Sequence, residues 1–103
     1  MTRERLSNRR PALTFDLQVG GLRYTATVGR FSDGRIGEVF LNDHKSNSAA
    51  DVNARDAAIA FSFAVQHGAD ADAIRRALSR DSRGNASGPL GAALDIIAKN
   101  PAS

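Results

Sequence analysis

Side chains that could carry out acid–base or metal chemistry are few in this chain and far apart. Asp33 and Glu38 could form a carboxylate pair, and the two histidines, His44 and His67, could bind a metal ion. Catalysis and metal binding both need such groups gathered around one point. Asp33 instead belongs to a turn signal, Glu38 to an alternating strand pattern, and the histidine spacing matches no recognised metal motif. We therefore predict no catalytic residue, no metal site, no cofactor and no enzyme activity.

A second kind of chemistry, anion binding, is suggested by the residues that precede a helical segment. Lys45, Ser46 and Ser48 lie directly before that segment. The first backbone amides of a helix have no partner within the helix, so amides, hydroxyls and a lysine could together hold a phosphate. The simpler interpretation is an N-cap, in which Ser48 closes the helix start and Asp51 lies in the first turn. Lys45, Ser46 and Ser48 are therefore candidate anion ligands.

Positive charge is concentrated at the N-terminus. Residues 1–10 hold four arginines and one glutamate, whereas residues 11–103 hold ten basic and ten acidic side chains. A basic tail on a neutral domain attracts nucleic acid weakly, and it lacks the clustered basic face of a dedicated binder. We expect a basic disordered arm over residues 1–11 that binds nucleic acid weakly. Its arginines are Arg3, Arg5, Arg9 and Arg10.

The composition also limits the compartment. The chain contains no cysteine, which excludes disulfides, thiolate metal sites, iron–sulfur clusters and thiol nucleophiles. No apolar run reaches the length of a membrane helix, which is about 18 residues, and residues 1–10 lack the apolar stretch of a signal peptide. We expect a cytoplasmic protein with no membrane partner.

Two alternating segments predict a β-hairpin that would support any binding surface. Residues 13–19 and 22–28 alternate apolar and polar side chains, which is the period of a half-buried strand. The two glycines between them can adopt the positive φ angles of a two-residue turn. Such a turn pairs Val19 with Leu22 and places all the apolar side chains on one face, whereas a slip of one residue would mix the faces.

A third strand is predicted directly after the hairpin. A turn signal leads into residues 36–42, which alternate again. If the hairpin sets the inner face, the third strand turns Ile36 and Phe40 away from the core. They would then lie beside Arg23 and Thr25 of the second strand.

This outer surface predicts an interface. An exposed phenylalanine on a small sheet leaves an apolar spot and an unpaired strand edge, and proteins usually cover or use both. We expect a homodimer, because closed twofold pairing is the commonest arrangement. The predicted interface residues are Arg23, Thr25, Ile36 and Phe40. The alternative is that the arm or the loop at residues 81–88 folds over Phe40.

Three helical segments follow the strands, at residues 49–67, at residues 71–80 and from Pro89 onward. The later half of the first is apolar nearly all round, so we expect it to be the central buried helix. Strands followed by helices indicate an α+β domain over residues 12–100, a three-stranded antiparallel meander with three helices on one face. The arginines expected on the outer side of the second helix are Arg75, Arg76 and Arg80. The apolar stripe of the third is Leu90, Ala93, Leu94 and Ile97.

Several short motifs between residues 22 and 68 occur together in a known family. They are Tyr24, Thr25 and Thr27, then Asp33-Gly34-Arg35, Glu38-Val39-Phe40-Leu41, Lys45-Ser46-Asn47-Ser48, and the run from Ala57 to Gly68. In this combination the segment resembles the TSCPD domain, a module of the C-terminal region of adenosylcobalamin-dependent (class II) ribonucleotide reductases. The family often reads Gly-Lys-x-Gly-Ser at residues 44–48, and its Thr-Ser-Cys-Pro-Asp motif is absent here, so no metal or redox role is carried over.

The resemblance implies a freestanding, non-catalytic accessory module for binding or assembly. Such a module would be linked to deoxyribonucleotide metabolism, with a reductase-type protein as its partner. The resemblance does not imply reductase activity, because the reductase barrel, its radical cysteine and its cobalamin site are missing. The other hypothesis is nucleotide or nucleic-acid binding through the basic arm and the helix start at Lys45 to Ser48.

Overall fold

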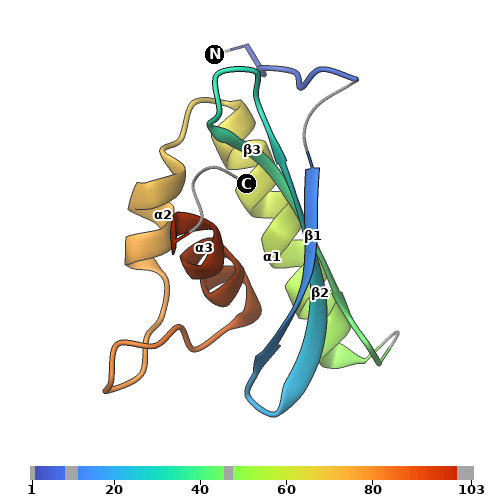
Figure 1. Ribbon diagram of the computed structural model, residues 1–103, viewed down its shortest axis with the longest axis vertical. Helices are drawn as coiled ribbons and strands as arrows, with labels where there is room; N and C mark the ends of the chain where they lie inside the picture. Colours follow the sequence, from blue (N-terminus) through green and yellow to red (C-terminus); the bar gives the residue numbers. More distant parts are fainter. Residues whose placement is uncertain (1, 9–11, 46–47, 100–103) are drawn as a thin grey trace.

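The computed structural model describes residues 2–8, 12–45 and 48–99. Figure 1 shows one antiparallel sheet in the order β1-β2-β3, followed along the chain by three helices. The strands are β1 (Ala12–Val19), β2 (Leu22–Arg30) and β3 (Ile36–Asp43). The helices are α1 (Ala49–Gln66), α2 (Ala71–Ala77) and α3 (Pro89–Lys99). The predicted α+β class and the predicted order of strands and helices are confirmed.

The β1–β2 hairpin has the predicted register. Val19 pairs with Leu22, and Phe15 pairs with Ala26 further along the ladder. Gly20 and Gly21 have φ angles of 60° and 76°, so the turn uses the conformation that glycine allows at little cost. The alternating pattern and the turn chemistry therefore determine together which side chains face the helices.

The start of β3 differs from the prediction. Gly29 pairs with Glu38, but Arg30 pairs with Ile36, so Gly37 is an extra residue in β3. A bulge of this kind shifts the alternation by one residue. Ile36 therefore packs against the core instead of lying on the outer face beside Phe40, and the prediction for Ile36 was wrong. Phe40 lies outward as expected and is 50% exposed.

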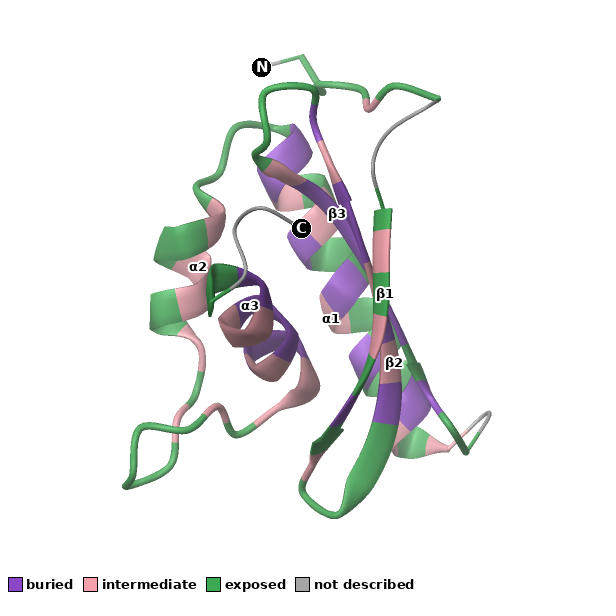
Figure 2. Cartoon of the chain, viewed as in Figure 1, coloured by how far each residue is buried: buried purple, intermediate pink, exposed green. Residues whose placement is uncertain are grey.

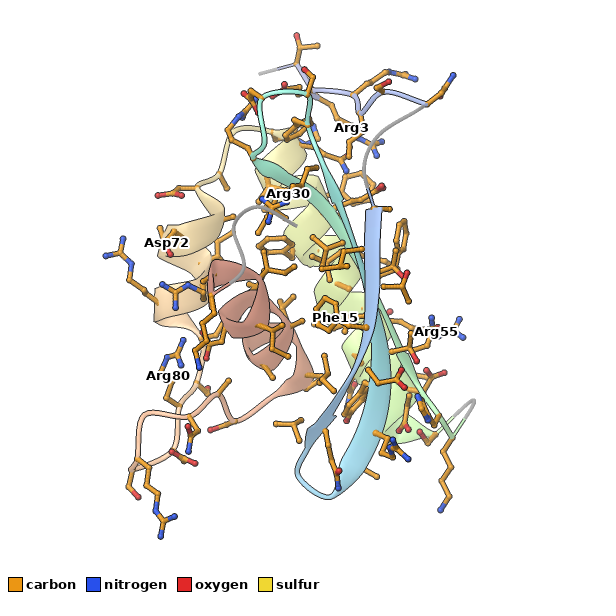
Figure 3. All side chains as sticks on the ribbon, in the orientation of Figure 1. Arg3, Phe15, Arg30, Arg55, Asp72 and Arg80 are labelled. Atoms are coloured by element: carbon orange, nitrogen blue, oxygen red, sulfur yellow. The ribbon has the colours of Figure 1, made fainter. Side chains whose placement is uncertain are left out.

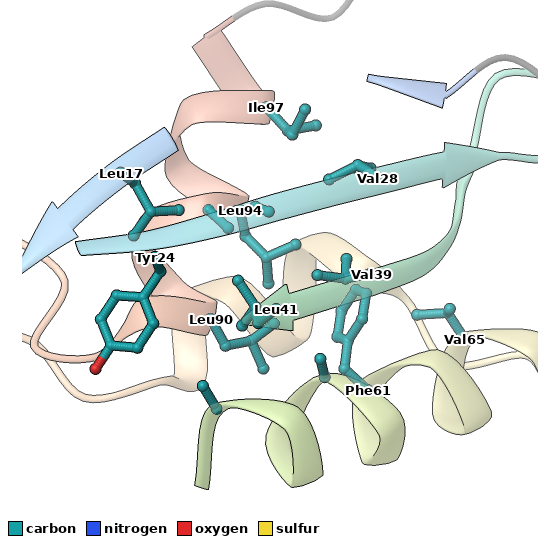
Figure 4. Packing of buried hydrophobic residues seen from close by; sticks show 14 residues of the cluster. Leu17, Tyr24, Val28, Val39, Leu41, Phe61, Val65, Leu90, Leu94 and Ile97 are labelled. Atoms are coloured by element: carbon teal, nitrogen blue, oxygen red, sulfur yellow. The ribbon is translucent and has the colours of Figure 1, made fainter. Parts of the chain in front are cut away.

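The core lies between the sheet and the helices α1 and α3 (Figures 2 and 4). Phe61 of α1 is buried against the sheet side chains, and so are the predicted stripe residues of α3. Ser48 caps α1 as expected, because its hydroxyl accepts a hydrogen bond from the backbone N–H of Asp51. Gly68, at φ 102°, follows the helix end.

The expectation that the later half of α1 is buried nearly all round was wrong. Only one stripe of the helix faces the sheet, and the opposite side carries Val52, Ile59 and Phe63, each about half exposed. These three positions are seven and four residues apart, which places them on one side of a helix. Among the described residues, neither α2 nor α3 covers this side.

Polar contacts hold α2, which is shorter than predicted and has no buried residue. Arg75 and Arg80 do not face outward as expected. Both reach the carboxylate of Asp95 on α3, at 3.1 Å from Arg75 and 2.8 Å from Arg80. Arg76 is exposed, as predicted, and pairs with Asp72. No described helix of the protein is both long and apolar enough to cross a membrane.

Candidate functional site

The outer face of the sheet, on the side away from the helices, carries a network of polar side chains. The hydroxyls of Thr14 and Thr27 lie 3.0 Å apart across the hairpin. The Thr25 hydroxyl donates to Asp16 at 3.0 Å, and its oxygen is also 3.0 Å from Nε2 of His44. These are contacts between neighbouring strands, and they fix the polar side chains of this face relative to one another.

The cluster of Asp16, Thr25 and His44 contains a carboxylate, a hydroxyl and an imidazole, but its geometry differs from that of a catalytic triad. In a triad the imidazole lies between the other two groups and uses both ring nitrogens. Here one nitrogen, Nε2, faces both the Thr25 hydroxyl and, at 3.7 Å, the Asp16 carboxylate. The arrangement forms part of a polar surface and lacks the order of a triad.

Four of the exposed large hydrophobic residues lie on one side of α1 and on the adjacent strand β3. We call this surface the α1 patch, and its residues are Phe40, Val52, Ile59 and Phe63. Phe40 and Ile59 line a shared hollow between β3 and α1. Arg55 lies at the rim of the same hollow, and its guanidinium is 3.2 Å from the buried carboxylate of Asp51. An exposed apolar area of this kind, with a charged residue at the rim of its hollow, is typical of a protein-binding surface.

The edge of β3 is not the open edge that the sequence predicted, because α1 runs along it. The Val39 N–H donates to the Ser62 hydroxyl at 2.9 Å, and that hydroxyl donates to the Val39 carbonyl at 3.2 Å. The Gln66 amide donates to the carbonyl of Gly37 at 2.8 Å. Side chains of α1 thus take the place of a fourth strand, and a partner at the α1 patch would contact side chains rather than extend the sheet.

The start of α1, predicted to bind an anion, is occupied by carboxylates. Asp43 accepts hydrogen bonds from the Lys45 N–H and the Ser48 hydroxyl. Asp51, which is fully buried, accepts from the Asp43 N–H at 2.9 Å. A phosphate at this helix start would face both carboxylates, and repulsion between like charges disfavours that. Ser46 lies outside the described residues, so the anion site remains a prediction from sequence.

The basic arm touches the body of the protein. The Glu4 N–H donates to the Gln66 carbonyl, and the Glu4 carboxylate accepts from Arg35 at 2.9 Å. The guanidinium of Arg3 lies over the Phe63 ring, 4.8 Å from its centre. Arg3 and Glu4 of the arm thus contact the folded domain. Arg5 is exposed, whereas Arg9 and Arg10 lie outside the described residues.

The residues considered for catalysis have separate structural partners. Asp33 binds Arg35 at 2.7 Å, and this hydrogen bond lowers the pKa of the Asp33 carboxyl. Glu38 is buried beside Gly29, where any added side chain would collide with it. Among the described residues, no three acidic, histidine or cysteine side chains come together as a metal site.

Comparison with known proteins relates the chain to one enzyme class. It is similar to the vitamin B12-dependent ribonucleotide reductase of Agrobacterium fabrum (strain C58), with 42% identity over 66 residues. That stretch is 64% of this chain and 5% of the reductase. The corresponding protein of Bradyrhizobium diazoefficiens is 36% identical over 70 residues, which cover 68% of this chain and 6% of the reductase. No family model and no solved structure matches the chain.

These matches support part of what the sequence resemblance implied. The chain is an α+β module related to a short segment of vitamin B12-dependent ribonucleotide reductases. Its assignment to the TSCPD domain is not confirmed, because no family model matches. The chain spans well under a tenth of the length of these relatives, so the activity of the whole reductases does not pass to it by similarity.

Proposed function

We propose that this protein is a non-catalytic accessory module that binds a vitamin B12-dependent ribonucleotide reductase through the α1 patch. The observation that carries the proposal is an exposed apolar surface on a module related to a short segment of such reductases. In the much longer relatives, the similar segment is part of the reductase chain and can pack against the rest of that chain. This chain would make the same kind of contact with a reductase, and it would act in the supply of deoxyribonucleotides.

The composition of the α1 patch fits protein recognition. Two of its four residues are phenylalanines, and large aromatic side chains supply much of the binding free energy at interfaces. Phe40 and Ile59, at 50% and 52% exposure, lie at the shared hollow, where a partner side chain can displace water from both. Arg55 lies at the rim of this hollow, and the next residue, Asp56, is also exposed, so a partner with one charge of each sign can be oriented there.

The way the polar groups are used supports a non-catalytic role. The acidic residues considered for catalysis have structural partners, and the exposed cluster around Thr25 lacks the order of a triad. The well-formed surface of this module is therefore apolar. Such a surface contributes affinity for a partner and no chemistry of its own.

The proposal is tested by co-precipitation with purified partner. The tagged chain is mixed with the vitamin B12-dependent reductase encoded by the same genome, and the washed resin is analysed for the reductase. We expect retention by the wild type and by Asn53→Glu, an exposed control on another side of α1. Ile59→Glu should lose retention, because it places a charge in the apolar contact. A reductase that is not retained by the wild type, or is retained equally by Ile59→Glu, overturns the proposal.

A further inference from the structure

We propose that a second copy of this chain pairs antiparallel with the free edge of β1 and joins the two sheets into one. The inference concerns a different surface and a different partner from the proposed function. Strand β1 is at one end of the sheet order, and β3, beside the α1 patch, is at the other. A dimer at β1 therefore leaves the α1 patch open, and either proposal can fail without the other.

The two edges of the sheet differ in how their backbone groups are used. At β3, the backbone N–H and C=O of Val39 bond to the Ser62 hydroxyl of α1, so these two backbone groups point away from β2. Because antiparallel ladders alternate, the residue opposite Val39, Val28, directs its backbone toward β1. The backbone groups of Leu13, which pairs with Val28, therefore bond to β2. The even-numbered residues of β1 direct their backbone N–H and C=O groups away from β2, toward the edge of the sheet. No strand of the described residues lies beyond this edge.

Apolar side chains beside this edge are only partly buried. Leu13 and Phe15 of β1 pack against the core but retain exposed surface, and so do Ala92 and Ile96 of α3. Figure 3 shows Phe15 on β1, and Figure 1 shows α3 next to the same strand. A strand added at the edge of β1 would cover these side chains and satisfy the outward backbone groups together. Strand addition at a sheet edge is a recurrent mode of association.

The sequence of β1 favours a second copy as the added strand. Two copies of β1 can hydrogen-bond through their outward N–H and C=O groups only if even-numbered residues lie opposite even-numbered residues. A twofold axis at Asp16 would place two carboxylates directly opposite each other, which is unfavourable. An axis at Leu17 would shift the pairing toward the hairpin turn and leave the first part of the strand unpaired. An axis at Phe15 pairs residues 12–18 with one another, and it places Phe15 against its counterpart and Asp16 against Thr14.

The same axis also fixes where the helices of the two copies lie. It is perpendicular to the sheet, so the two copies of α3 lie on the same side of the joined sheet. Because α3 contacts β1, the α3 helices of both copies then lie near the centre of the dimer. The joined sheet has six strands, each end of it is a β3 edge, and α1 side chains already occupy that edge. The assembly is therefore closed and does not extend into a fibre.

Light scattering over a concentration series tests the dimer. We expect the wild type to have twice the monomer mass and Thr14→Pro to be monomeric. Proline removes an outward N–H of an edge strand without breaking the β1–β2 ladder. Thr14→Val is the matched control, because it also loses the hydroxyl contact with Thr27 but keeps the N–H, and it should remain dimeric. Phe40→Glu, on the other surface, should remain dimeric too. A monomeric wild type, or a folded Thr14→Pro dimer, overturns the proposal.

Cross-linking tests the register independently of any proline effect on folding. Because the chain has no cysteine, each introduced cysteine reports only on its own position. Phe15→Cys would face its counterpart in a non-hydrogen-bonded pair, which is within disulfide reach. Asp16→Cys would face Thr14 and is the control. We expect mild oxidation to give covalent dimers with Phe15→Cys much faster than with Asp16→Cys. Equal rates, or faster linkage at position 16, overturn the proposed pairing.

Discussion

Replacing Asp95 by asparagine tests whether polar contacts hold α2 in place. The carboxylate receives two hydrogen bonds from Arg80, both at 2.8 Å, and one from Arg75 at 3.1 Å. The hydrogen bonds from Arg80, followed by the one from Arg75, lower the pKa of Asp95 from 3.8 to about 2. At about 1.4 kcal/mol per pKa unit, the charged form gains about 2 kcal/mol. All three side chains keep roughly a quarter of their surface exposed, so we expect Asp95→Asn to cost about 1 to 2 kcal/mol at pH 7.

The pH dependence of this cost distinguishes charge pairing from packing. The pKa of Asp95 is lower in the folded than in the unfolded chain, so its stabilisation is complete above about pH 4. It is lost as the pH falls through about 2, where the folded wild type becomes protonated. Urea unfolding of both proteins from pH 7 to pH 2 should show a difference that disappears at low pH, and Asp56→Asn, on the exposed side of α1, should show little difference at any pH. An effect that persists at pH 2, or no effect at pH 7, would refute the reasoning.

Two further outcomes are expected. Ser62→Ala should destabilise the protein by about 1 to 2 kcal/mol in urea unfolding, because the backbone N–H and C=O of Val39 lose their partner at a partly buried edge. An unchanged free energy of unfolding would mean that water replaces the hydroxyl without cost. Removal of residues 1–10 should abolish binding to a generic DNA duplex at low salt, measured by fluorescence anisotropy, since those residues carry the excess positive charge. Equal binding by the truncated chain would indicate a basic site on the folded domain.

Local patterns with one dominant cause could be read from the sequence. The hairpin register followed from alternation on both sides of two glycines, and the structure has the same pairs. The buried stripe of α3 was also predicted, because its apolar residues recur at helical spacing after Pro89. In both cases the propensity of the chain and the position of the core favour the same structure.

The predictions were wrong where contacts between distant parts of the chain determine the position of a side chain. The bulge at Gly37 moved Ile36 into the core, although a glycine within a strand is itself a signal for a bulge. Arg75 and Arg80 were expected in solvent, and nothing near them in sequence identifies Asp95, on another helix, as their partner. The α1 patch was missed because apolar residues around a whole helix were taken for core. The spacing of Val52, Ile59 and Phe63 could have indicated a second apolar side.

The central claim is that the α1 patch binds a vitamin B12-dependent ribonucleotide reductase. Isothermal titration of the chain into the purified full-length reductase from the same genome measures this binding directly. We predict saturable binding by the wild type and by Asn53→Glu, with a negative heat-capacity change from apolar burial, and at least a tenfold weaker affinity for Ile59→Glu, about 1.4 kcal/mol. The absence of saturable heat with the wild type, or an unchanged affinity of Ile59→Glu, would contradict the account.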